Sequence, residues 1–191
     1  MDRPNEYFQQ NPNSKNNVLY REKNNELGKI SKPDDKIELK KVWIEEKGAK
    51  NIYVLKMFLP KDNVDFNREL RFITFLQKIP GIIKVNKNYE KAINNYELAN
   101  EKKFIIVMEE GKTSLNEVLQ LRKNQGKEYT EDEILYILYE IMKTFNEMHE
   151  LKITHSDIKP DNILLVTSEE NSNKFHYKII DFECSTKEDS D

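Results

Sequence analysis

The chain has 191 residues, and its 31 Lys and Arg nearly balance its 34 Asp and Glu, so the formal charge of −3 excludes a broad nucleic-acid-binding surface. The length allows one ordinary domain, or one domain plus a tail, and a hydrophobic fraction of 37% is enough for a core. The single cysteine, Cys184, excludes an internal disulfide framework, and three scattered histidines leave no zinc ligand set. The lack of a disulfide framework predicts an intracellular protein, and no apolar run is long enough for a signal peptide or a membrane span.

The first elements predicted in chain order are a polar tail and a strand-rich segment. Residues 1–27 are rich in Asn, Lys and Glu and are predicted to be disordered, since they cannot bury enough apolar surface to offset their ordering entropy. Strands are predicted at Ile37–Ile44 and Ile52–Leu59, with a turn at Glu45–Asn51, because both segments are β-branched and aromatic. Two shorter strands are predicted at Ile82–Val85 and Lys103–Met108.

Three helices are predicted from apolar residues at helical spacing. The first covers Asn63–Ile79, where a proline and a glycine follow. The other two begin at capping boxes, since Ser114 and Thr130 are each followed three residues later by a glutamate. The last helix is predicted to run to about His149.

A hairpin of Asn162–Val166 and Phe175–Phe182 is predicted near the end of the chain. Strands and one helix come first, then mostly helices, then this hairpin. That order predicts an α+β chain with a small sheet-rich part and a larger helical part, connected by Met108–Lys112.

Two loops carry the polar side chains that indicate chemistry. Residues His155–Asn162 read H-S-D-I-K-P-D-N between a long amphipathic helix and a short apolar strand, and Asp181-Phe182-Glu183 follows the next strand. This arrangement resembles the eukaryotic protein kinases, whose catalytic loop reads H-R-D-x-K-x-x-N and whose metal-binding turn reads D-F-G. A single Asp or Asn in such a loop often does no more than cap a turn, but here the spacing, the flanking elements and both motifs agree.

The resemblance implies a protein-kinase-like fold of two lobes. Residues 28–108 would form a complete small lobe with an antiparallel sheet, and residues 109–191 the hinge and the first part of an incomplete helical large lobe. It also implies ATP and Mg²⁺ as cofactors, and a protein substrate. In this resemblance Asp157 accepts the proton of the substrate hydroxyl, Lys159 steadies the γ-phosphate, and Asn162 and Asp181 bind Mg²⁺.

A lysine and a glutamate upstream are predicted to pair. Lys56 lies in the middle of an apolar strand, and Glu69 lies on the apolar stripe of the following helix, so each would otherwise bury a lone charge. The resemblance implies the same pair, with Lys56 holding the α- and β-phosphates and Glu69 orienting it. Two alternatives remain open: an edge-strand lysine that reaches water, and a solvated helix glutamate.

The segment after the strand at Lys103–Met108 resembles the hinge of the family. Met108 would lie at the adenine pocket, and the backbone of Glu109 to Gly111 would bind the adenine edge. A buried strand that ends in a turn fits the same residues.

Three departures from the family pattern bear on activity. Residues Ile30–Ile37 stand where a glycine-rich phosphate loop is expected but contain no glycine, which predicts weak nucleotide binding. Glu183 replaces the glycine of D-F-G, which removes the permissive backbone that lets the turn flip. Ser156 replaces the arginine of H-R-D, so control through a phosphorylated activation loop is not expected in its usual form. The H-S-D triplet, with V-M-E-E-G and Leu115, resembles the monopolar-spindle checkpoint kinases, a dual-specificity group.

The chain also ends soon after Asp181, where the family continues through an activation segment and further helices. The sequence therefore predicts a serine/threonine-type protein kinase domain that is impaired by truncation, with an apolar helix face at Thr130–His149 through which the chain associates with itself or a partner. The alternatives are a pseudokinase-like module that binds a nucleotide or a protein, and a small-molecule phosphotransferase.

Overall fold

The computed structural model describes residues 20–22, 37–46, 49–86, 104–167 and 175–188. The chain divides into two compact units: Met1–Phe66 with Val85–Glu110, and Asn67–Lys84 with Gly111–Asp191. The lobe limits predicted from the sequence, 28–108 and 109–191, stay predictions.

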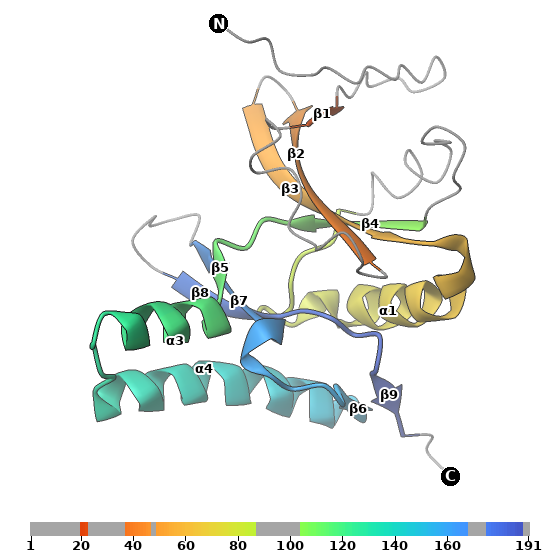
Figure 1. Ribbon diagram of the computed structural model, residues 1–191. Coiled ribbons are helices and arrows are strands. Elements are labelled where there is room, and N and C mark those ends of the chain that lie inside the picture. Colours follow the sequence, from red (N-terminus) through yellow and green to blue (C-terminus); the bar gives the residue numbers. More distant parts are fainter. Residues whose placement is uncertain (1–19, 23–36, 47–48, 87–103, 168–174, 189–191) are drawn as a thin grey trace, which may run out of the picture. The chain divides into compact units, whose positions relative to one another are not determined.

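The first unit contains an antiparallel sheet of four strands in the order β1-β2-β3-β4 (Figure 1). Its strands are β1 (Tyr20–Glu22), β2 (Ile37–Glu46), β3 (Ala49–Phe58) and β4 (Phe104–Glu109). The turn predicted at Glu45–Asn51 is wrong in extent, because the pairing of β2 with β3 continues to Glu46 and Ala49. Backbone hydrogen bonds make this ladder, so it continues through polar residues that carry no strand signal.

Three residues of the segment predicted to be a disordered tail form β1, which pairs with β2 from Tyr20 opposite Ile44 to Glu22 opposite Val42. The rest of that tail lies outside the described residues, as do residues 30–36 of the glycine-free segment.

Aromatic rings form part of the core of the first unit. Phe58 is fully buried, and its ring centroid lies 5.6 Å from that of Phe66, which stacks at 5.0 Å on Phe104. These contacts fix the start of the helix that carries Phe66 against β3 and β4.

That helix is α1 (Asn63–Phe75), flanked by the 3-10 turns η1 (Pro60–Asp62) and η2 (Leu76–Lys78). The helix predicted over Asn63–Ile79 is confirmed as far as Phe75, beyond which the chain tightens into η2, and its apolar stripe is buried at Phe66, Ile73 and Leu76. The two units share α1, since Phe66 belongs to the first and the residues from Asn67 onward to the second.

The strand predicted at Ile82–Val85 is wrong. Ile82 makes an isolated parallel bridge to Ile179 in the second unit, whereas Val85 makes an antiparallel bridge to Met108 in the first. Residues with partners in two different sheets cannot form one ladder. Next to the first bridge, a Cβ on Gly81 would overlap the side chain of Thr144, so a larger residue would require a shift there.

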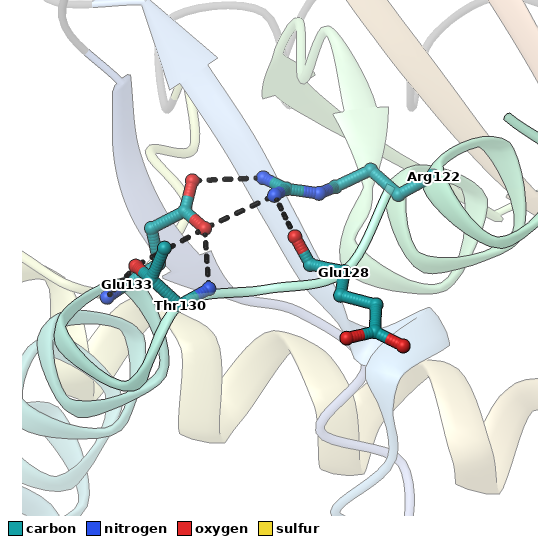
Figure 2. Close-up of polar contacts among 4 residues, drawn as sticks. All are labelled: Arg122, Glu128, Thr130 and Glu133. Atoms are coloured by element: carbon teal, nitrogen blue, oxygen red, sulfur yellow. Dashed lines mark hydrogen bonds and ion pairs between the residues drawn. The ribbon is translucent and has the colours of Figure 1, made fainter. Parts of the chain in front are cut away.

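The second unit contains α3 (Leu115–Asn124) and α4 (Glu131–Glu150), and both predicted capping boxes are present, at Ser114 and at Thr130. An arginine links the two helices (Figure 2). Arg122 of α3 donates from Nη1 and Nη2 to the two carboxylate oxygens of Glu133 in α4, at 2.9 and 3.0 Å, and from Nη2 to the carbonyl of Glu128 at 2.6 Å. Its guanidinium also lies 3.8 Å from the ring centroid of Tyr129.

Short strands complete the second unit. The predicted hairpin is present as β7 (Ile163–Thr167) and β8 (Phe175–Ile179), to which β5 (Thr113–Ser114) adds as a third strand. A separate ribbon pairs β6 (Ile153–Thr154) with β9 (Thr186–Lys187). The 3-10 turn η3 (Pro160–Asn162) lies between β6 and β7.

Helix α4 buries one face and exposes apolar residues on another. Ile141, Phe145 and Met148 are buried, but the exposed set comprises Ile134, Leu135, Tyr136, Leu138, Tyr139 and Met142. Self-association through this exposed face stays a prediction. Within the described ranges, no helix combines the length and the apolar character that crossing a bilayer requires.

Candidate functional site

The loop between β6 and β7 carries the H-S-D-I-K-P-D-N motif and is organised around a buried histidine. His155 is 1% exposed, and its Nε2 lies 2.9 Å from the carbonyl oxygen of Ile180. The backbone N–H of Asp157 donates to Nδ1 at 3.3 Å, so Nδ1 carries no proton and Nε2–H donates to Ile180. Burial lowers the pKa of His155, which favours this neutral ring.

Asp157 is held by two neighbours from the same motif. Lys159 Nζ donates to its Oδ2 at 2.7 Å, and the amide nitrogen of Asn162 donates to Oδ2 at 2.8 Å and to its carbonyl at 2.9 Å. The hydrogen bond from Lys159 is the main cause that lowers the pKa of the Asp157 carboxyl, with a smaller effect from Asn162. The carboxylate is therefore ionised at neutral pH and fixed in direction, as a proton acceptor needs to be.

The D-F-E turn is attached to this loop. Asn162 is buried, and its carbonyl accepts a hydrogen bond from the backbone N–H of Ile180 at 3.0 Å, directly before Asp181. Phe182 is fully buried, with its ring centroid 5.1 Å from that of His155. The second unit thus brings together Asp157, Lys159, Asn162 and Asp181, as the sequence predicts.

Two residues of the site have left-handed backbone conformations. Ser156 has φ of 64° and Asp181 has φ of 70°. Residues other than glycine rarely adopt such values, and they persist at sites that the surrounding contacts over-determine. The residue before each of them, His155 or Ile180, takes part in a hydrogen bond between the loop and the turn, and His155 also accepts one from the N–H of Asp157 within the loop.

Oxygen donors suited to a hard cation gather near Asp181. One carboxylate oxygen each of Glu69, Asp181 and Glu183 lies within 4.8 Å of the others, and Glu69 is fully buried. Asn162 binds Asp157 through its amide nitrogen, so its amide oxygen is the atom that could bind a cation. Carboxylate and amide oxygens are ligands that Mg²⁺ accepts, so Asn162 and Asp181 fit the metal implied by the family resemblance.

The remaining predicted residues lie mostly in the first unit. Lys56 is 6% exposed in β3 opposite Leu39 and Ile106, and its ammonium lies 5.3 Å from the ring centroid of Phe58. Because Glu69 belongs to the second unit, its pairing with Lys56 stays a prediction.

The predicted hinge residues occupy the end of β4 and the residues after it. Met108 is buried opposite Val54, and Glu109 lies opposite Tyr53. Gly111 opens the second segment of the other unit, where a Cβ would lie 2.6 Å from Leu164 Cδ1. Their roles in binding adenine stay predictions.

The sequence did not point to Arg68, which lies next to Glu69 in α1. Its Nη1 donates to the carbonyl oxygen of Glu183 at 3.1 Å. No local signal identifies such a residue, because its partner is a backbone atom far along the chain.

Comparisons with known proteins agree with the motifs. Residues 42–191 match the protein kinase domain family. The chain is 31% identical over 129 residues to extracellular signal-regulated kinase 2 of Dictyostelium discoideum, covering 65% of this chain and 32% of that protein. It is 30% identical over 122 residues to calcium-dependent protein kinase 27 of Arabidopsis thaliana, covering 63% and 23%. It is 28% identical over 150 residues to a probable serine/threonine-protein kinase of Dictyostelium discoideum, covering 76% and 12%. The chain thus spans a third or less of the length of these relatives.

Proposed function

Because this chain belongs to the eukaryotic protein kinase family, we propose that it binds ATP with Mg²⁺ and transfers the γ-phosphate to Ser or Thr hydroxyls of proteins. The observation that carries the proposal is the hydrogen-bonded set of Asp157, Lys159 and Asn162, joined through Asn162 to the residue before Asp181. The relatives that are described as serine/threonine kinases support the choice of hydroxyl.

The roles follow from what each side chain can do. The ionised carboxylate of Asp157 accepts the hydrogen bond of the substrate hydroxyl and takes its proton. The hydroxyl oxygen bonds to the γ-phosphorus as the bond from that phosphorus to the bridging oxygen breaks and ADP leaves. Lys159 lies 2.7 Å from that carboxylate and brings a cation to the place where phosphate charge develops.

The other polar residues bind and orient the nucleotide. Asn162 and Asp181 are proposed to hold Mg²⁺, which when bound neutralises the charge of the phosphates during transfer. Lys56 is proposed to bind the α- and β-phosphates with Glu69 as its partner, and the backbone from Glu109 to Gly111 to bind adenine beside Met108.

A second candidate function is a binding module without phosphoryl transfer. Two sequence observations favour it: Ile30–Ile37 contains no glycine, and Glu183 replaces the glycine of the metal-binding turn. A small-molecule phosphotransferase is the third candidate, although Lys159 at its position favours protein substrates.

The test measures binding and transfer separately with the 191-residue chain. Calorimetry with ATP, with and without MgCl₂, is expected to show weak binding that requires the metal. Incubation with radiolabelled ATP, a mixture of Ser/Thr peptides and a panel of small alcohols identifies the acceptor.

We predict that Asp157→Asn lowers peptide phosphorylation by at least about 100-fold, because the general base is lost while the hydrogen bonds of its neighbours are largely kept. Asp132→Asn, the same change at an exposed position of α4, is the matched control and should leave the rate within about twofold. Metal-dependent ATP binding without any phosphate transfer would favour the binding module. Radiolabelled phosphate on a small alcohol, and not on a peptide, would favour the small-molecule phosphotransferase.

A further inference from the structure

Arg68 connects α1 to the D-F-E turn within the second unit. Its Nη1 lies 3.1 Å from the carbonyl oxygen of Glu183, two residues after Asp181. A hydrogen bond from a guanidinium to a carbonyl is charge-assisted and therefore stronger than one between neutral groups. Arg68 itself is on the exposed side of the helix, so its contribution comes from this contact rather than from burial.

The turn that receives this bond needs support. Asp181 has φ of 70°, a value that a side chain with a Cβ disfavours, and Ser185 closes the turn by donating to the carbonyl of Phe182 at 3.1 Å. The carboxylates of Asp181, Glu183 and Glu69 also crowd together within 4.8 Å, and like charges at such distances repel. The guanidinium of Arg68 is bound to the carbonyl of Glu183, so it holds the strained backbone of the turn and places a positive charge near these carboxylates.

A second contact holds the same segment to the same helix. The ammonium of Lys187 lies 5.1 Å from the ring centroid of Phe75, near the end of α1. Arg68 and Phe75 are seven residues apart and so share one face of the helix, about 10 Å apart along its axis. Their partners Glu183 and Lys187 are four residues apart, which spans at most about 13 Å of extended chain, so the segment runs along α1.

We propose that Arg68 is a positioning residue: from α1 it holds the backbone of Glu183 and so keeps Asp181 in the conformation in which its carboxylate meets the metal. This inference rests on the proposed function for the role of Asp181. It adds that an arginine of this chain holds the turn, so that no phosphorylated residue is needed to hold it. Ser156, at the position where the family has an arginine, cannot supply such a cation.

The test compares Arg68→Gln, Arg68→Lys and the control Arg71→Gln in the 191-residue chain. Arg71 is exposed on the same helix and lies over the ring of Phe72 at 6.0 Å. The first measurement is amide hydrogen exchange by NMR without nucleotide or metal. Arg68→Gln is expected to speed exchange of the Ser185 amide about tenfold, because a charged hydrogen bond is lost, while the amides of α4 stay unchanged.

The second measurement is the MgCl₂ concentration that gives half-maximal ATP binding. This MgCl₂ concentration should rise about threefold to tenfold in Arg68→Gln. In Arg68→Lys it should lie close to the value of the unmodified chain, and in Arg71→Gln it should be unchanged. Unchanged Ser185 exchange in Arg68→Gln, or an equal effect of Arg71→Gln, overturns the proposal. If the unmodified chain binds no ATP at any MgCl₂ concentration, the proposed function fails, whereas the exchange experiment still decides whether Arg68 holds the turn.

Discussion

Ser156 has a strained, left-handed backbone conformation that its motif does not reveal. Its φ of 64° lies in the left-handed region, because His155 is bonded to Ile180 on one side and Asp157 to Asn162 on the other. The residues of the site could be predicted from the sequence, since motif and spacing name them. The backbone conformation could not, because tertiary hydrogen bonds impose it.

We predict opposite effects for two substitutions of Ser156. Ser156→Gly should raise the free energy of unfolding by up to about 1 kcal/mol, since relief of strain exceeds the added entropy of the unfolded chain. Ser156→Val should lower it by about 1–2 kcal/mol, since a β-branched residue tolerates this region poorly. Urea unfolding followed by circular dichroism measures both, and shifts of the same sign would contradict the account.

At the scale of elements, Arg122 and Glu133 tie α3 to α4 (Figure 2). The hydrogen bond from Arg122, with help from the Thr130 amide, lowers the pKa of the Glu133 carboxyl to about 2 from an ordinary value of 4.5. Because the folded pKa is depressed, the stabilisation is fully present above about pH 4.5 and is lost as the pH falls toward 2.

We therefore predict that Glu133→Gln lowers the melting temperature at pH 7, and that the difference from the unmodified chain shrinks steadily between pH 4.5 and pH 3. Glu131→Gln, in the same helical turn, is the control and should show a smaller difference at neutral pH. Thermal unfolding at a series of pH values checks this, and a difference that stays constant with pH would refute it.

The same elements show what local sequence can predict. Both helix starts were predicted at the right residue, because a capping box is a contact between residues three apart. The partner Arg122 was not predicted, since it lies eleven positions from Glu133 on another helix. The strand expected at Ile82–Val85 failed for a related reason: apolar residues indicate burial but not which sheet buries them.

At the scale of the whole molecule, α1 is divided between two units, and the sequence does not predict this division. Its apolar stripe predicts one helix with one buried face, and both features are present. The assignment of Phe66 to one unit and Asn67 onward to the other depends on contacts with residues far away in the chain. For the same reason the pairing of Lys56 with Glu69 stays a prediction.

The close approach of Gly81 to α4 gives a further prediction. Gly81→Ala would place a methyl group against Thr144, so it should lower the free energy of unfolding by about 1–3 kcal/mol through overpacking. Stopped-flow measurements in urea should show that most of this loss appears as faster unfolding. A fall in the folding rate of the same size would contradict it.

The effect on the unfolding rate is expected because the bridge between Ile82 and Ile179, beside Gly81, forms late in folding. Ile82 and Ile179 are about a hundred positions apart, so joining them closes a long loop. The conformational entropy of that loop is lost before the contact stabilises the chain. Helix α4 and the β7–β8 hairpin need only nearby residues and can form within microseconds. The strand edge at Ile179 should therefore exist before the chain around Gly81 reaches it, so that this closure is a late step of folding and an early one of unfolding.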